Sequence, residues 1–274
     1  MALSRLADGA IVSAYAGFTR SVRSLARAAD FYCGGLGFRP DGKRLRLGLE
    51  SIELLECAGS IVAVPPPGQI DTAFQHIAIV TSDMAAALQR LAGFDFRPIT
   101  EGGAVTLAAS AGGVTAFKFR DPDGHPLELI AFPPGTGDPR WQTATQEGPT
   151  LGIDHSAIVV ADAERSIRYY ETRLGFTVSA RQTNHGPEQD RLDGLRGTEV
   201  DVVALRPAVA TTPHLELLAY RSPRPAAPVS VASEPDADLL QWWLQTAQEV
   251  AGSAPPVSQD PDGHRHCLLM PRRR

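Results

Sequence analysis

Two pairs of histidine and glutamate residues recur in this chain in the same order and in similar surroundings. His76 lies in FQHIAIVTSD, and Glu128 follows it in DPDGHPLELIAF. His155 lies in IDHSAIVVAD, and Glu216 follows it in PHLELLAY. Imidazole nitrogens and carboxylate oxygens are ligands of divalent metal ions. Because equivalent positions of a repeat supply them, this spacing predicts one shared metal site where the repeated units face each other.

The types of ligand limit the possible metal ions but do not identify one. Two neutral imidazoles and two carboxylates form a borderline-to-hard set that suits Zn²⁺, Ni²⁺, Mn²⁺, Co²⁺ or Fe²⁺. The alternative is that the histidines are structural and that the carboxylates lie on a wet strand face. A carboxylate inside an apolar run such as LELI or LELLAY is costly to bury without a partner, so we favour a role in a cleft.

The elements that must position these residues are clearest in the third quarter of the chain. IDHSAIVV reads as a buried strand, and the segment AERSIRYYETRL after it reads as a helix. Asp162 is the predicted N-cap, Gly175 the predicted C-terminal glycine, and Ile167, Tyr170 and Leu174 form one apolar stripe. FTVSARQ, VDVVALRP and HLELLAYR follow as strands, which gives the order β-α-β-β-β.

The same order of elements recurs on either side of this unit, and the outer copies keep fewer of the repeated residues. Residues 74–133 repeat it, with DPDGHP as a tight turn before the last strand. Residues 11–64 keep Glu53 but have Gly17 where the other units have histidine. The unit from about 226 has Cys267 at the position of the last-strand glutamate, with VSVAS predicted as its first strand and DADLLQWWLQTAQEVAG as its helix.

The predicted fold is therefore α+β and is built from four βαβββ modules. The modules span residues 1–68, 69–147, 148–223 and 224–274, and the first and the last are degenerate. Linkers rich in Pro and Gly, such as VPPPGQ and RSPRPAAP, separate them and suit surface connections.

The bulk composition excludes several classes of partner. The chain has 274 residues, 43% of them hydrophobic and 21% charged, which is typical of a globular protein. A net charge of −5 and an isoelectric point near 5.8 predict no nucleic-acid partner, and no apolar run is long enough to span a membrane. Three widely spaced cysteines favour a reducing cytoplasm. We expect a monomer or a homodimer.

Four such modules, with HisXaaAlaIle at the start of a unit and DPDGHPLELI at its end, resemble the vicinal oxygen chelate superfamily. That superfamily includes glyoxalase I, extradiol dioxygenases and bleomycin-binding proteins. The resemblance implies two open, glyoxalase-like barrels, each made of two modules. It also implies that His76, Glu128, His155 and Glu216 bind the metal ion.

The distribution of the repeated histidines and glutamates among the four modules favours one way of pairing them. If the second module pairs with the third, one cleft collects both histidines and both glutamates. The first and fourth modules then share the other cleft, which collects almost nothing. Pairing in chain order remains open, but it would divide the set between two incomplete clefts. A distance above about 10 Å between His76 and His155 would exclude the first arrangement, because ligand bonds are about 2.0–2.2 Å long.

The resemblance implies a glyoxalase-like reaction on a small oxygenated metabolite. The metal would hold two adjacent substrate oxygens, Glu128 or Glu216 would act as the base, and the metal charge would stabilise the enediolate. The alternatives are an Fe(II) extradiol dioxygenase and a metal-free binding protein of the bleomycin-resistance type. His185, in the polar loop NHGPEQDRLDG, is the candidate substrate contact, the alternative being a solvated loop.

Overall fold

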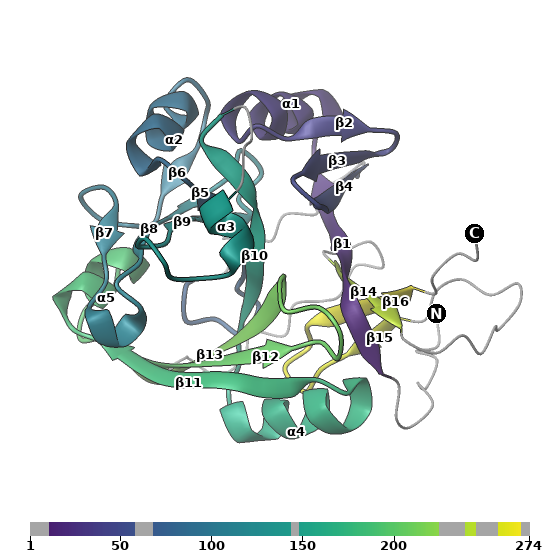
Figure 1. Ribbon diagram of the computed structural model, residues 1–274, viewed down its shortest axis with the longest axis vertical. Coiled ribbons are helices and arrows are strands. Elements are labelled where there is room, and N and C mark those ends of the chain that lie inside the picture. The colour runs from purple at the N-terminus through teal and green to yellow at the C-terminus, as the bar shows by residue number, and fades with distance from the viewer. Residues whose placement is uncertain (1–10, 58–67, 144–147, 225–238, 245–256, 270–274) are drawn as a thin grey trace, which may run out of the picture.

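Two open, twisted sheets carry the fold (Figure 1). This computed structural model describes residues 11–57, 68–143, 148–224, 239–244 and 257–269. Seven strands form one sheet in the order β15-β16-β14-β1-β4-β3-β2, and nine form the other. The order of the second sheet is β11-β12-β13-β10-β5-β9-β8-β6, with β7 also paired to β8.

The two sheets draw their strands from different parts of the chain. The nine-stranded sheet consists of β5 (Gln75–Thr81), β6 (Arg97–Pro98), β7 (Val105–Thr106), β8 (Thr115–Arg120), β9 (Pro126–Ala131), β10 (Thr150–Val159), β11 (Thr177–His185), β12 (Glu199–Arg206) and β13 (His214–Ser222). The seven-stranded sheet consists of β1 (Val12–Val22), β2 (Arg39–Asp41), β3 (Arg44–Leu47), β4 (Glu50–Glu56), β14 (Leu239–Leu244), β15 (Val257–Gln259) and β16 (Arg265–Leu269). Strands of the second and third predicted modules thus share one sheet, and those of the first and fourth share the other. The module boundaries themselves stay a prediction.

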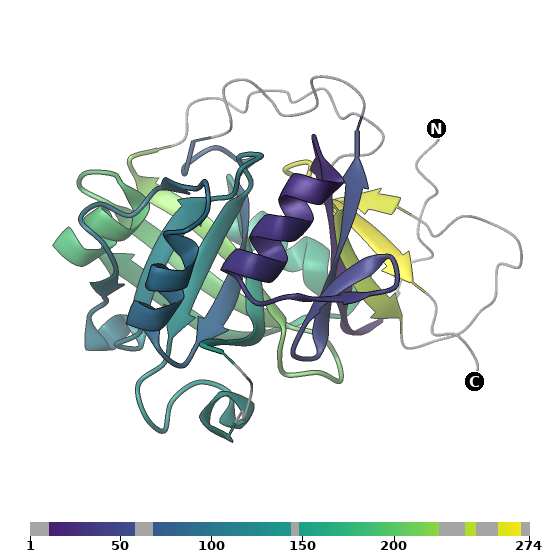
Figure 2. The same cartoon turned by 90° about the horizontal axis from the view of Figure 1, so that it is seen from above.

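The described helices are α1 (Leu25–Asp30), α2 (Met84–Leu91), α3 (Pro139–Thr143), α4 (Ala163–Leu174) and α5 (Pro187–Asp193), with a π-helical turn at Phe31–Gly35 and a 3₁₀ turn at Ala109–Ala111. Helices α1, α2 and α4 contribute buried side chains to the core that the two sheets share, whereas α3 and α5 pack Trp141 and Leu192 into a separate cluster with Ala78 and Ile130. Helices α1 and α2 lie side by side at the top of Figure 1 and in front in Figure 2. No helix in the described part of the chain is long and apolar enough to cross a membrane.

Helix α4 forms for the local reasons that the sequence indicates. The side chain of Asp162 accepts a hydrogen bond from the backbone N–H of Arg165, which satisfies one free donor of the first turn. Ile167, Tyr170 and Leu174 are buried on one face. Gly175 ends the helix with φ of 70°, a conformation that favours glycine. The predicted cap, stripe and end of this helix are confirmed.

The prediction of a helix over the segment DADLLQWWLQTAQEVAG is wrong for its described part. Leu239–Leu244 forms strand β14, which pairs antiparallel with β1 and parallel with β16. Leu240 and Trp242 are buried, and Gln241 between them bonds Thr19, an alternation with the period of a strand. The predicted strand VSVAS and the remainder of the predicted helix lie outside the described residues.

The two DPDGH turns tie the sheets together. In one turn Asp121 accepts a hydrogen bond from the Tyr32 hydroxyl at 2.9 Å, and His125 Nε2 lies 2.7 Å from the carbonyl oxygen of Ser21. The other turn makes the same contacts from the opposite sheet, with Asp260 and Tyr170 at 2.8 Å and His264 and Val159 at 2.9 Å. The turn histidines are therefore structural, as their position in the turn predicts.

A buried chain of hydrogen bonds beside the second turn makes stability depend on pH. Trp242 donates to His266 Nδ1 at 3.1 Å, and His266 Nε2 lies 2.9 Å from the Tyr170 hydroxyl, which donates to Asp260. The ring is therefore neutral. Burial is the main cause that lowers the pKa of His266 from 6.5 to about 4.

Acidification should therefore destabilise the fold through His266. The unfolded chain takes up a proton at this ring below pH 6.5, and the folded chain does so only below about pH 4. The free energy of unfolding should fall between these values by about 3 kcal/mol. Urea unfolding of the native chain and of His266→Asn, compared from pH 7 to 4, tests this. Parallel curves for the two proteins would contradict the assignment.

Candidate metal centre

Four neighbouring strands in the middle of the nine-stranded sheet bring the predicted ligands together. His76 is on β5, Glu128 on β9, His155 on β10 and Glu216 on β13. Alanines occupy the positions between them: Ala78 lies opposite Glu128 and His155, and Ala157 lies opposite His76 and Glu216. These methyl groups leave room on that face for the longer side chains to converge.

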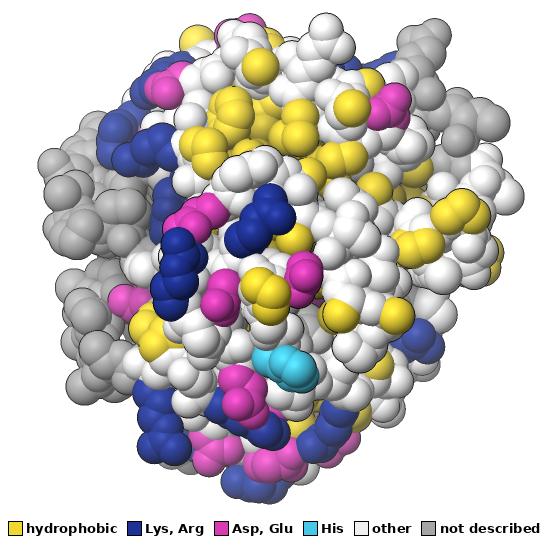
Figure 3. All heavy atoms as spheres, turned by 90° about the vertical axis from the view of Figure 1, so that its left-hand side faces the viewer, with side chains coloured by type: hydrophobic (Ala, Val, Ile, Leu, Met, Phe, Trp, Pro, Cys, Tyr) yellow, Lys and Arg dark blue, Asp and Glu magenta, His cyan; other side chains and the backbone are white. Residues whose placement is uncertain are grey.

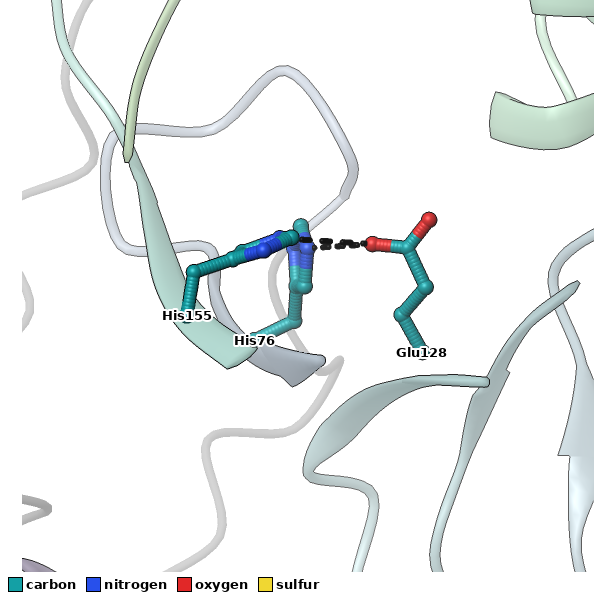
Figure 4. A group of neighbouring side chains, drawn as sticks. All are labelled: His76, Glu128 and His155. Atoms are coloured by element: carbon teal, nitrogen blue, oxygen red, sulfur yellow. Dashed lines mark hydrogen bonds and ion pairs between the residues drawn. The ribbon is translucent and has the colours of Figure 1, made fainter. Parts of the chain in front are cut away.

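The side-chain atoms converge within the reach of one ion. His76 Nε2 lies 2.9 Å from Oε2 of Glu128, and His155 Nε2 lies 3.8 Å from the same oxygen (Figure 4). Oε2 of Glu216 lies 3.5 Å from His155 Nε2. The centroids of the two imidazole rings are 5.9 Å apart. The ligand atoms of His76, Glu128 and His155 all lie within 4.8 Å of one another.

The donor set fits a divalent cation. His76, Glu128 and His155 expose only 1%, 6% and 4% of their surface. His155 Nδ1 lies 3.0 Å from Oδ2 of Asp154, so this carboxylate holds a ring proton on Nδ1 and directs Nε2 toward the two glutamates. This buried Nε2 has no hydrogen-bond partner among the described residues. A buried polar atom in that state needs an explanation, and a metal ion between Nε2 and the carboxylates supplies one.

The charges of the site are set by burial and by neighbours. Burial raises the pKa of Glu128, but the imidazoles of His155 and His76 and the ammonium group of Lys118 outweigh it and hold that pKa well below its usual range. Burial lowers the pKa of His76, and Glu128 offsets this only in part. His76 is thus neutral and able to bind a metal.

His155 and its neighbour Asp154 behave differently. Burial lowers the pKa of His155, but Glu216, Asp154 and Glu128 raise it by more, to well above its usual value. Burial raises the pKa of Asp154, and the bond to His155 and the charges of His214 and His155 bring it down to about 2. Asp154 is therefore a fixed anion behind His155, and a metal ion bound at Nε2 would displace a proton.

A comparison with known families decides the membership of the chain. The profile of the Glyoxalase/Bleomycin resistance protein/Dioxygenase superfamily matches residues 15–129 and 152–251. The chain belongs to this superfamily. A search of curated proteins gives no match.

Solved structures of the superfamily share the fold. Glyoxalase I from Zea mays superposes with a TM-score of 0.61 at 19% identity, covering 93% of this chain and 91% of that one. A putative dioxygenase from Bacillus subtilis subsp. subtilis str. 168 superposes with a TM-score of 0.55 at 13% identity, covering 96% and 86% of the two chains. At these identities the likeness establishes the glyoxalase fold, and the chemistry has to come from the site.

The surroundings of the candidate metal centre are buried on the side of Lys118 and partly exposed on the side of Glu216. Lys118, beside Glu128 on the sheet, forms an ion pair of 2.7 Å with Asp193 of α5, and both side chains are buried. The backbone N–H of Glu101 donates a hydrogen bond of 2.9 Å to the carbonyl oxygen of Arg191 in α5. On the other side, the side chains of Glu216 and His214 are 21% and 17% exposed. A ligand would therefore reach the centre past Glu216.

Sequence reasoning missed several residues of this site. The segment after His185 was predicted as a loop, but it contains α5, which begins at Pro187 and ends before Gly194 with φ of 60°. Proline at the start and glycine after the end are helix signals that could have found it. Asp154 was also missed, although it directly precedes His155. His214 was missed as well, although it lies two residues before Glu216 and hence on the same face of the strand.

The structure does not bring His185 to the other candidate residues. It is exposed at the end of β11, opposite Glu199. Ala180, which shares a row across the sheet with Glu216, lies five positions earlier. Five residues of strand span about 16 Å. A contact between His185 and a substrate stays a prediction.

The seven-stranded sheet carries Arg44 opposite its surviving glutamate Glu53, just as the other sheet carries Lys118 opposite Glu128. Gly17 occupies the position equivalent to His76, and a Cβ atom there would lie 2.8 Å from the carbonyl oxygen of Ser51. Arg44 donates to Gln241 at 3.2 Å, to Ser51 at 3.3 Å and to the backbone of residue 16 at 3.4 Å. Its guanidinium lies 3.9 Å from Glu53. A covalently held cation thus faces the surviving glutamate of this cleft.

Proposed function

We propose that this chain is a divalent-metal-dependent enzyme of the glyoxalase type. It would remove a proton next to a carbonyl group of a small oxygenated metabolite, in an isomerase or lyase reaction. The observation that carries the proposal is the convergence of His76, Glu128 and His155 beside Glu216, with the buried Nε2 of His155 facing both carboxylates but making no hydrogen bond among the described residues. Interspersed acidic and basic side chains on the face shown in Figure 3 fit a small-molecule partner better than a polyanion.

The two glutamates would divide the work. A divalent ion held by the histidines and glutamates would bind two adjacent substrate oxygens and stabilise the negative charge that develops on them. Glu128 is buried and lies 2.9 Å from His76, so it is fixed as a ligand. Glu216 is partly exposed, and its nearest ion-pair contacts are 3.5 Å long. Glu216 is therefore the carboxylate free to take the proton from the substrate carbon.

The assignment of the base predicts a separation of metal binding from proton transfer. Glu216→Gln should retain metal, because three ligands remain, and should slow proton exchange at least 100-fold, since a positioned base contributes about 10²–10⁴-fold. The measurement is deuterium exchange from D₂O into a panel of 2-hydroxycarbonyl compounds, followed by NMR with metal-loaded protein. Glu199→Gln, which changes an exposed ion pair with Arg221, is the control. Loss of exchange in Glu128→Gln with normal exchange in Glu216→Gln would reverse the roles.

The three-residue group of two histidines and one carboxylate also supports a second candidate. Such a triad with open positions suits non-haem Fe(II) oxygenases. Oxygen uptake with catechols, after anaerobic loading with Fe²⁺, would favour the dioxygenase over the isomerase. A protein that carries no metal as purified, and whose melting temperature rises with an organic ligand, would instead be a binding protein of the bleomycin-resistance type.

A further inference from the structure

His214 lies between two carboxylates at the accessible edge of the candidate metal centre. Its Nδ1 is 3.8 Å from Oδ2 of Asp154, and its Nε2 is 3.5 Å from Oε1 of Glu216. The ring is mostly buried, with 17% of its side chain exposed. Ligand atoms of Asp154, His155 and His214 lie within 4.8 Å of one another, so these three could also hold an ion, but neither the repeat of the sequence nor the metal group of the proposed function includes His214.

The sheet places His214 directly beside His155. The two residues face each other on the parallel strands β10 and β13, and their ring centroids are 5.2 Å apart. Oδ2 of Asp154 lies near Nδ1 of both rings, at 3.0 Å from His155 and 3.8 Å from His214. One carboxylate thus lies behind both imidazoles and turns the Nε2 side of each toward Glu216.

Asp154 is itself held firmly. Trp141 donates its indole N–H to Oδ1 at 2.8 Å, and the Thr212 hydroxyl donates to the backbone carbonyl of Asp154 at 2.8 Å. Because the carboxylate is anchored from α3 and from the loop before β13, the two imidazoles in front of it have a rigid support.

Glu216 bridges the two imidazoles. Oε1 faces Nε2 of His214 and Oε2 faces Nε2 of His155, each at 3.5 Å. A carboxylate held at one oxygen has a defined direction for the other. Glu128 has no counterpart of this arrangement, because the residue two positions before it is Pro126, which has no polar side chain, and His76 holds its carboxylate instead.

We propose that His214 is a positioning residue that holds Oε1 of Glu216 so that Oε2 faces the metal centre and the substrate proton. This proposal rests on the proposed function in that Glu216 is the base. It gives a physical reason why the two equivalent glutamates differ: one is fixed by a metal ligand, and the other is directed by a residue outside the metal group.

Two substitutions separate a positioning role from a merely structural one. His214→Phe fills the space of the ring without its nitrogens, and His214→Gln keeps an N–H donor on a flexible side chain. Loss of the charge-assisted contact of 3.5 Å between His214 and Glu216 corresponds to about 10- to 100-fold in rate. We expect deuterium exchange by His214→Phe to fall by that factor through kcat with little change in KM, and His214→Gln to recover part of it.

A spectroscopic measurement on the same variants does not depend on knowing the substrate. The Co²⁺-loaded protein absorbs visible light according to the ligands around the ion. We expect the affinity for Co²⁺ to stay within about threefold in both variants, because the proposed metal group of His76, Glu128, His155 and Glu216 does not include His214. The spectrum should shift in His214→Phe and stay near that of the native protein in His214→Gln. A native spectrum and native exchange in His214→Phe would overturn the proposal, and so would a loss of Co²⁺ binding in that variant. If the native protein itself bound no Co²⁺, the proposed function would fail, and this inference with it.

Discussion

Replacing His155 with alanine should strip the bound divalent metal from the protein. We expect metal analysis to give about one ion per chain for the native protein and less than about 0.1 for the variant. The ligand set is small and mostly buried, so the loss of one imidazole leaves only two carboxylates and one histidine to hold the ion. Removal of an outer-shell partner alone typically costs 10- to 100-fold in metal affinity, and a ligand contributes more.

Two further variants guard the interpretation of that result. His185→Ala removes an exposed imidazole at the end of β11 and should leave the metal content unchanged. Asp154→Asn keeps all four ligands but weakens the bond that orients His155, so its metal affinity should fall by about 10- to 100-fold. Undiminished metal in a folded His155→Ala protein would defeat the assignment of the site.

Replacing Asp193 with asparagine should lower the free energy of unfolding by about 3–5 kcal/mol. Asp193 is fully buried and accepts hydrogen bonds from Lys118 at 2.7 Å, from Gln189 at 2.7 Å and from Tyr220 at 3.0 Å. The substitution removes the carboxylate that directly compensates the buried Lys118 ammonium group and leaves it only the charges of Glu128 and Glu216. The cost of that incompletely compensated charge, rather than the net value of the ion pair, sets the size of the effect.

Urea unfolding with matched variants measures this effect. Glu199→Gln removes an acidic partner from Arg221 at the exposed end of β12, and it should change the unfolding free energy by less than about 1 kcal/mol. The double substitution Lys118→Met with Asp193→Leu removes both charges and should recover most of the loss. A similar small change in Asp193→Asn and Glu199→Gln would show that the Lys118 charge finds water or another partner.

The parts of the site that could be predicted from the sequence are those fixed by local pattern. A strand alternates its side chains and a repeat copies positions, so the histidine that opens a unit and the glutamate that ends it were recognisable without coordinates. The helix around Tyr170 was predictable for the same reason, because its cap, stripe and terminal glycine all lie within one short segment. The fold of the superfamily was predictable because the β-α-β-β-β order of elements recurs along the sequence.

The parts that were missed depend on contacts between distant segments. Leu239–Leu244 has a composition that suits a helix, but it fills the gap between β1 and β16, and sheet pairing outweighs the weak local preference. Lys118 and Asp193 are 75 residues apart in the sequence, so no local pattern could have shown that they meet inside the cleft. His214 becomes meaningful only through its neighbours Asp154 and Glu216 across the sheet.

Arg44 provides an internal control for experiments in which the proposed metal ion is removed. A chelator would remove the proposed metal ion from the face of β5 and β10, but it cannot remove a guanidinium that is part of the chain. Treatment with a chelator should therefore speed amide hydrogen exchange in β5, β9, β10 and β13. Exchange in β1 and β4 should stay unchanged. The seven-stranded sheet is thus an internal control within the same chain, because its cation, the guanidinium of Arg44, cannot be removed.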